Sequence, residues 1–313
     1  MEYRTLRGTD LVVPRIGFGC NRIGAPMPEA RRREVETTLR TAIERGINFF
    51  DTADVYSHGS ADRLLRIAFA GQRDKVVICS KAGRPIWRRP KLRQRITRTL
   101  SRRLTRSRRA AHTTVPVESG ATYTPAYITA AIDGSLDRLG TDYLDLFLLH
   151  GPHPAVLGRD DLFDCLERLK QQGKIRHYGA SLSGSRSSTE DHLPWFERPG
   201  LSVLQVLVNP LKSVDMARVV PAARAQGVGL IARQPFHKGA VFEDRRFLDL
   251  ATANPHYTPA QMALRFGLEQ DGADMVLAGV RSLAHLEDNL AALTGPGLSP
   301  HEREQLRSLT VVV

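Results

Sequence analysis

Eight short runs of apolar or β-branched residues recur along the chain, and they constrain the fold more than any other feature. They begin at Ile16, Ile47, Val76, Leu144, Tyr178, Val203, Gly229 and Met275. Stretches with helical periodicity separate them; in residues 33–43, for example, Val35, Leu39 and Ala42 share one face. Strand followed by helix, eight times over, predicts an α/β fold of the (β/α)8 TIM-barrel type.

The spacing of these runs supports one barrel domain over residues 1–313. Five of the seven start-to-start intervals span 25 to 34 residues, which is the length of one strand–helix unit with short loops. The step from Val76 to Leu144 is 68 residues and that from Gly229 to Met275 is 46. These steps predict a long insertion at about 84–123, after strand three, and a second at 236–257. Because loops that follow barrel strands lie on the catalytic face, we expect both insertions to flank the mouth of the active site.

The ends of the predicted elements also have recognisable signals. Residues 3–13 predict a β-hairpin ahead of the barrel, turning at Gly8, Thr9 and Asp10. A capping hydroxyl followed by proline predicts helix starts at 124–125, 258–259 and 299–300. Thr258 with Gln261 also forms the pattern of a capping box.

The positive charge of the chain is concentrated in one segment. Twelve of the 45 Lys and Arg lie between residues 84 and 109, which contain no acid, and the other 33 balance the 33 Asp and Glu. Within it, Leu92, Ile96, Leu100 and Leu104 recur every four residues and predict an amphipathic basic helix. Three uses stay open: a solvated flap packed on the barrel rim, recognition of an anionic substrate or acidic carrier protein, and binding to a membrane or nucleic acid. The first two are favoured, and no nucleic-acid partner is expected.

Neither a membrane span nor a metal site is expected from the sequence. The charged N-terminus lacks the apolar stretch of a secretory signal, and no run approaches the length that crosses a bilayer. Cys20, Cys79 and Cys165 lie far apart and have no zinc-ligand spacing. We therefore expect a cytoplasmic protein with reduced thiols and no bound metal.

Four polar residues stand at or just beyond the ends of predicted strands: Asp51, Tyr56, Lys81 and His150. A phenol is a weak acid with a pKa near 10, so it needs help to protonate a carbonyl oxygen. An ammonium group beside Tyr56 would favour its ionised form, and Asp51 would hold Lys81 by a charge-assisted hydrogen bond. His150 would orient and polarise the carbonyl oxygen. The four residues together predict carbonyl reduction with Tyr56 as the general acid.

At this point the sequence resembles the aldo-keto reductase superfamily nearly from end to end. The diagnostic stretches are Gly46-Ile47-Asn48-Phe49-Phe50-Asp51-Thr52-Ala53-Asp54-Val55-Tyr56, Ser80-Lys81, and residues 135–146 leading to His150. The resemblance implies an NADPH-dependent oxidoreductase that reduces an aldehyde or ketone, with these four residues as its catalytic set.

The resemblance also implies a set of residues that bind the dinucleotide. At the end of strand one, Gly19, Cys20 and Asn21 resemble the turn that contacts the dinucleotide in the family. Asp51 belongs to the same cofactor-binding set. Other positions correspond to residues that hold the nicotinamide, the pyrophosphate and the adenosine: Ser181, Gln205, Arg233, Gln234, Pro235, Phe236, Gly279, Arg281, His285, Asp288 and Asn289. Arg281 favours NADPH over NADH, because a guanidinium can pair with the 2′-phosphate that NADH lacks.

Three positions depart from the family pattern. Arg233 stands where many members have an aromatic residue that stacks on nicotinamide, Leu182 replaces an Asn, and Cys20 replaces a Thr. Two functions stay open: an NADPH-dependent carbonyl reductase, and a cofactor-binding regulatory or interaction module with little turnover. The four polar residues favour the enzyme, whose expected substrate is a small carbonyl compound, with an anionic or a carrier-bound compound among the alternatives that stay open.

Overall fold

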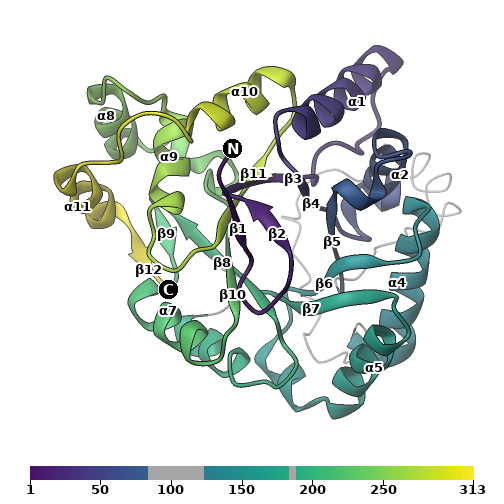
Figure 1. Ribbon diagram of the computed structural model, residues 1–313. Coiled ribbons are helices and arrows are strands. Elements are labelled where there is room, and N and C mark those ends of the chain that lie inside the picture. Colours follow the sequence, from purple (N-terminus) through teal and green to yellow (C-terminus); the bar gives the residue numbers. More distant parts are fainter. Residues whose placement is uncertain (84–122, 183–187) are drawn as a thin grey trace, which may run out of the picture.

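A computed structural model describes residues 1–83, 123–182 and 188–313, and these residues form a closed parallel barrel with helices around it (Figure 1). Around the barrel, in hydrogen-bonded order, are β3 (Ile16–Gly19), β4 (Phe49–Asp51), β5 (Val77–Ala82), β6 (Leu144–His150), β7 (Ile175–Ser181), β8 (Val203–Asn209), β10 (Gly229–Arg233) and β11 (Met275–Gly279). Pairing of β11 with β3 and of β10 with β8 closes the ring. The predicted (β/α)8 fold and its eight strands are confirmed.

The helices lie on the outside of this ring. They are α1 (Glu29–Glu44), α2 (Ser60–Ala68), α4 (Pro125–Leu139), α5 (Asp160–Gln171), α6 (Thr189–His192), α7 (Met216–Ala225), α8 (Arg245–Ala253), α9 (Pro259–Leu268), α10 (Leu283–Ala291) and α11 (Pro300–Leu309). The short strands β9 (Lys212–Ser213) and β12 (Val311–Val312) pair beside the end of β8. Among the residues that the structure describes, no helix has both the length and the apolar character that a bilayer span requires.

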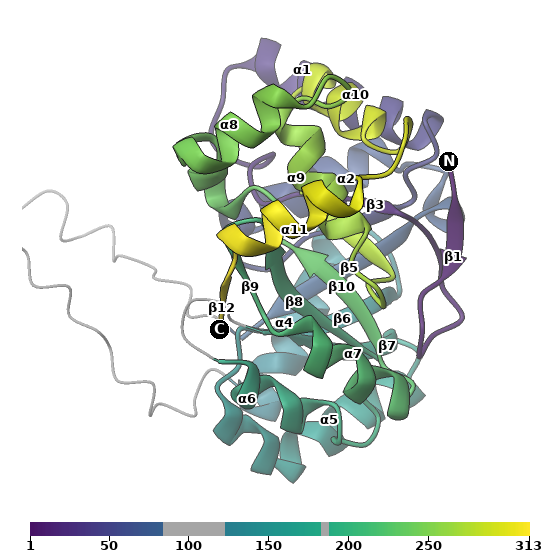
Figure 2. The ribbon, with the colours of Figure 1, turned by 90° about the vertical axis from the view of Figure 1, so that its left-hand side faces the viewer.

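The predicted N-terminal hairpin is present as β1 (Tyr3–Thr5) and β2 (Val12–Pro14). It covers the end of the barrel at which the strands begin, since Gly8 lies against the carbonyl oxygen of Ser202 and Asp10 accepts hydrogen bonds from Arg176 and His177. Figure 2 shows β1 on the opposite side of the molecule from β9 and β12. The other end of the barrel, where the strands finish, is left for the functional site.

Two layers of apolar side chains follow from the alternation of strand residues. The inner one fills the barrel with Phe49, Val77, Cys79, Leu146, Leu148, Val203, Ile231, Met275 and Leu277, and the hairpin adds Leu6, Leu11 and Val13. Alternate residues such as Phe50, Ile78 and Phe147 point outward and pack under the helices. Because side chains on one strand face recur every second residue, the inner layer fixes which later residue of each strand points inward.

The predicted helix starts are also present. Thr124, Thr258 and Ser299 are the N-caps of α4, α9 and α11, and each is followed by proline. The capping box of Thr258 with Gln261 is formed. The insertion after β10 contains the 3-10 helix η6 (His237–Phe242) and α8. The predicted basic helix lies outside the described residues.

Candidate active site

A polar layer closes the barrel above the apolar inner layer. The next inward positions along the strands are Asp51, Lys81, His150, Gln205 and Arg233, each two residues beyond an apolar member of the inner core. Four of them are buried, with exposed fractions of 6% for Asp51, 2% for Lys81, 6% for His150 and 1% for Gln205. Strand alternation therefore brings together side chains that are up to 182 positions apart in the sequence.

Lys81 is the centre of this layer. Its ammonium donates to Asp51 Oδ1 at 2.6 Å and to the carbonyl oxygen of Thr52 at 2.8 Å. Burial lowers the pKa of this ammonium, but the Asp51 carboxylate, together with smaller effects of Tyr56 and Cys79, outweighs burial and raises the pKa above its usual value. Lys81 therefore carries its charge throughout the physiological pH range, and Asp51 fixes the position of that charge.

Tyr56 lies over Lys81, with the lysine nitrogen 5.0 Å from the centre of the tyrosine ring. Burial raises the pKa of the Tyr56 phenol, and the charge of Lys81 and its hydrogen bond to the hydroxyl act against this rise. The direction of the Lys81 effect agrees with the sequence analysis, but burial is the larger effect. The phenol therefore holds its proton at neutral pH, as a group that donates a proton must.

The two residues that follow Tyr56 have unusual backbone conformations. In the 3-10 helix η1 (Tyr56–Gly59), Ser57 and His58 have φ of 51° and 54°, the left-handed region that non-glycine residues rarely occupy. Such a residue costs about 1–2 kcal/mol, so the surrounding structure must hold this turn. We name residues 52–59 the Tyr56 turn.

His150 completes the predicted set. Its ring is nearly perpendicular to that of Tyr56, with 6.0 Å between ring centres. Its carbonyl oxygen accepts a hydrogen bond from the hydroxyl of Tyr123 at 3.0 Å. The structure thus brings all four predicted catalytic residues to one end of the barrel.

The predicted nicotinamide-binding residues extend the same layer. Ser181 ends β7 and is buried, and Gln205 on β8 donates from its amide nitrogen to Asp51 Oδ1 at 2.8 Å. Arg233 ends β10, is half-buried, and donates to the carbonyl oxygen of Leu182. Its charge acts on Tyr56 against the larger effect of burial, which raises the pKa of the phenol. Gln205 is therefore tied to the Lys81–Asp51 pair, and Arg233 adds a second cation near the phenol.

The residues after Arg233 form a tight bend. Gln234 has a left-handed φ of 59°, Pro235 is buried, and the half-buried ring of Phe236 packs on Phe242 with 5.6 Å between ring centres. His237 donates its backbone N–H to the carbonyl oxygen of Gln234 at 2.9 Å. This bend follows directly on the end of β10.

At the end of β3, the predicted dinucleotide turn presents three different environments. Gly19 lies so near the carbonyl oxygen of Ala278 that a Cβ would stand 3.1 Å from it, and Asn21 is exposed. Cys20 is fully buried, with its sulfur 3.7 Å from the carbonyl oxygen of Phe18. Burial raises the pKa of the Cys20 thiol well above its usual value, so this side chain is a neutral core group.

The predicted adenosine-binding residues lie around the start of α10. Gly279, Arg281 and His285 are exposed, and Ser282 caps the helix. Asp288 accepts hydrogen bonds from Thr258 and Gln261 and so ties α10 to the start of α9. Asn289 is buried, and its amide nitrogen has no partner among the described residues.

These residues fit a phosphorylated dinucleotide. The exposed Arg281 guanidinium supplies a cation, and the buried Asn289 amide is a donor without a partner in the described part of the chain. Arg31 on α1 adds a second guanidinium, because it donates to the carbonyl oxygen of Arg281. The sequence analysis missed Arg31; its only signal was the run of arginines at 31–33 near the start of a predicted helix.

The sequence analysis also missed the support of the Tyr56 turn. Thr52 donates to Asp62 Oδ1 at 2.7 Å, and Asp62 forms a buried ion pair with Arg138 at 2.9 Å. The Arg138 side chain also lies against Gly59, which has a φ of 79° and where a Cβ would stand 2.5 Å from Arg138 Cδ. Asp54 accepts a hydrogen bond from Tyr127 at 3.0 Å. Arg138 and Tyr127 both belong to α4, which no local pattern connects to residues 52–59.

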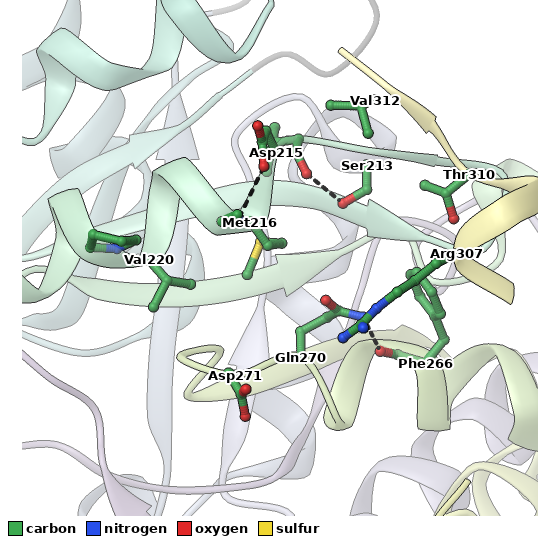
Figure 3. A pocket seen from close by; sticks show the side chains of 13 residues that line it. Ser213, Asp215, Met216, Val220, Phe266, Gln270, Asp271, Arg307, Thr310 and Val312 are labelled. Carbon is green, nitrogen blue, oxygen red and sulfur yellow. Dashed lines mark hydrogen bonds between the residues drawn. The ribbon is translucent and has the colours of Figure 1, made fainter. Parts of the chain in front are cut away.

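An open cavity of about 520 Å³ lies elsewhere, on the flank of the barrel between α7, α9 and α11 (Figure 3). Its lining includes Met216, Val220, Phe266, Gln270 and Arg307. None of the predicted catalytic or cofactor-binding residues lines it. We therefore place the functional site at the polar layer, where the buried charges and the strained backbone lie.

Comparison with known proteins defines the class. A profile of the Aldo/keto reductase family matches residues 15–310, and the chain belongs to this family. The resemblance found in the sequence is confirmed.

Individual relatives are similar over nearly the whole chain. The Bacillus subtilis protein named uncharacterized oxidoreductase YqkF is 25% identical over 99% of this chain and 97% of its own length. Aldo-keto reductase AKR11C1 from Bacillus halodurans (holo form) has the same fold, with a TM-score of 0.76, 24% identity, and coverage of 100% of this chain and 97% of that one. An aldo-keto reductase from Klebsiella pneumoniae, solved in complex with NADPH, is 26% identical, with a TM-score of 0.72 over 99% of this chain and 95% of that one.

Proposed function

We propose that the protein reduces the carbonyl group of an aldehyde or ketone to an alcohol, with NADPH as the hydride donor. The observation that carries the proposal is the position of the Lys81 ammonium, 2.6 Å from Asp51 and 5.0 Å from the centre of the Tyr56 ring. A charged amine held against a neutral phenol is what proton donation to a carbonyl oxygen requires. Membership of the family and the Klebsiella pneumoniae relative solved with NADPH support the cofactor.

In this proposal each residue has one task. NADPH supplies the hydride for the carbonyl carbon when it is bound. Tyr56 donates its proton to the carbonyl oxygen, and the charge of Lys81 stabilises the phenolate that remains. Asp51 keeps Lys81 charged and in place, and His150 orients the carbonyl oxygen. Burial of the layer excludes water and strengthens these electrostatic interactions.

The cofactor would be held by residues at both ends of its length. Ser181, Gln205 and Arg233 would hold the nicotinamide, and Arg281 with Arg31 would hold the adenosine phosphate. Asn289 would donate to the adenosine end through its unused amide nitrogen. Arg233 offers a planar cation where an aromatic ring would otherwise stack on the nicotinamide.

The test compares Tyr56→Phe with the wild-type protein. We expect wild-type protein to oxidise NADPH when members of an aldehyde and ketone panel are added, and we expect Tyr56→Phe to lose this activity while it binds NADPH with unchanged affinity. Binding is measured by fluorescence titration. NADPH binding by the wild type without turnover of any panel member would refute the proposal and favour the cofactor-binding interaction module.

Three finer expectations stay predictions: the single-domain organisation, the cytoplasmic location and the anionic or carrier-bound substrate. The last depends on residues 84–109, which lie outside the described part of the chain. Running the carbonyl panel with a variant that lacks these residues tests it. A loss confined to anionic carbonyl compounds would support the prediction, and an equal loss for neutral ones would contradict it.

A further inference from the structure

Asp54 is a buried carboxyl group in the Tyr56 turn, and the catalytic role of Tyr56 proposed above does not use it. It is 5% exposed, and its backbone N–H donates to the carbonyl oxygen of Lys81 at 3.0 Å. Its Oδ2 accepts a hydrogen bond from the Tyr127 hydroxyl at 3.0 Å. Its Oδ1 is buried and has no partner among the described residues. An ionised carboxylate has about four acceptor sites, so this one is held by few contacts.

The charges around Asp54 come from three neighbouring elements. Arg138 and Tyr127 face it from α4, Asp62 faces it from α2, and Lys81 on β5 contacts it through the backbone while its ammonium turns to Asp51. Arg138 is itself paired with Asp62. Among the residues that the structure describes, Asp54 therefore has no cation of its own, and the Tyr127 hydroxyl is its main side-chain partner.

This environment makes Asp54 sensitive to pH. Burial raises its pKa to about 6, while hydrogen bonds from Tyr127 and the Val55 N–H and the charge of Arg138 act in the opposite direction. Loss of the Tyr127 hydrogen bond would raise the pKa further, since that bond favours the ionised form.

We propose that Asp54 is a positioning residue: the hydrogen bond it accepts from Tyr127 ties the start of α4 to the Tyr56 turn and so holds the Tyr56 hydroxyl against Lys81. The inference rests on the proposed carbonyl reduction. The turn needs such a tie, because Ser57 and His58 are in left-handed conformations that relax when the surrounding contacts weaken. A charged acceptor forms a hydrogen bond roughly twice as strong as a neutral one, so protonation of Asp54 loosens the tie.

The consequence is an acid limb in the pH profile of the reaction, that is, a fall in the rate of reduction at low pH. Above the pKa of Asp54 the turn is held and Tyr56 is in place, and below it kcat falls. Binding of NADPH does not depend on the tie, so its affinity stays constant through this limb. Removal of the Tyr127 hydroxyl breaks the tie at every pH, so the limb disappears with it.

The experiment measures kcat, KM and NADPH affinity from pH 4.5 to 9 for the wild type, Tyr127→Phe, Asp54→Asn and the double variant. Tyr178→Phe is the matched control, because it removes another hydrogen bond from a tyrosine to a carboxylate, 2.7 Å to Glu167, outside the polar layer. We expect the wild type to lose activity below about pH 6. Tyr127→Phe and Asp54→Asn should both abolish the limb, because neither variant has a bond that protonation of Asp54 can loosen, and Tyr178→Phe should leave it in place.

At pH 8 both single variants should lower kcat by about five- to tenfold with unchanged NADPH affinity. The double variant should lose no more than Tyr127→Phe alone, because both substitutions act on the same bond. An acid limb that persists in Tyr127→Phe or in Asp54→Asn would overturn the inference while the reductase activity itself stood.

A wild-type protein without any turnover would instead refute the proposed function. The tie between Asp54 and Tyr127 would then be tested by thermal unfolding. The pH at which the stability gain of Asp54→Asn over its parent becomes complete should be higher in the Tyr127→Phe background than in the wild type, because it follows the folded-state pKa of Asp54, and an unchanged pH would overturn the tie.

Discussion

Replacement of Lys81 by methionine tests the electrostatic core of the proposed mechanism. Methionine keeps the length and the apolar part of the side chain but removes the charge, which is the property on which the argument depends. The ammonium lies 5.0 Å from the centre of the Tyr56 ring. At an effective dielectric constant of about 20, a unit charge at this distance stabilises a phenolate by about 3 kcal/mol, which corresponds to roughly a hundredfold in rate or more.

The same replacement has a separate cost in stability. It leaves the Asp51 carboxylate buried, with the Gln205 amide as a remaining donor at 2.8 Å. Removing one partner of a buried ion pair typically destabilises a protein by about 3–5 kcal/mol. Urea unfolding therefore has to accompany the kinetics, and kcat is compared only at temperatures at which both proteins are folded. A folded Lys81→Met protein with kcat within tenfold of wild type would refute the electrostatic argument.

Asp51→Asn combined with Lys81→Met separates the two effects. The double variant removes both charges, so we expect it to regain part of the lost stability without regaining activity. Recovery of both together would mean that Lys81 acts through folding alone.

Two further predictions follow from the adenosine end and from the buried carboxyl. Arg281→Gln should raise the Kd of NADPH by about tenfold or more and change that of NADH little, because only NADPH carries the 2′-phosphate; an equal loss for both cofactors in a fluorescence titration would contradict this. Asp54→Asn should be more stable than the wild type above about pH 6 by up to about 3 kcal/mol and equal to it below about pH 4. The sign follows from the raised pKa, because ionised Asp54 costs free energy only in the folded state. This cost is complete once the pH exceeds the folded pKa. A stability difference between Asp54→Asn and wild type that did not vary with pH would show that Asp54 is ionised without cost.

The order of strands and helices was predictable because it depends on local patterns. Alternation within a strand and capping at a helix start involve residues a few positions apart, so strand order, the N-terminal hairpin and the starts of α4, α9 and α11 were all predicted and are confirmed. The juxtaposition of Asp51, Lys81 and His150 was predictable for a related reason. Parallel barrel strands end on one face, so polar residues at their ends must converge there.

The contacts between the site and its surroundings required the tertiary structure. Tyr127 meets Asp54 across 73 positions and Arg138 meets Asp62 across 76, and no periodicity relates positions so far apart. Residues assigned from the resemblance also proved to have partners in the protein: Gln205 donates to Asp51, Arg233 donates to Leu182, and Asp288 ties α10 to the start of α9.

The pKa of Tyr56 also depends partly on what the sequence indicates and partly on the tertiary structure. The sequence indicated a lysine beside the phenol and therefore the direction of its effect. Burial opposes that effect and is larger, and burial depends on how many atoms of distant segments pack around the ring. The sequence by itself determined the barrel and the identity of the charged groups at its end, because these follow from local pattern. Only the packing of the helices against the barrel decided how far those groups are shielded from water and which neighbours hold them.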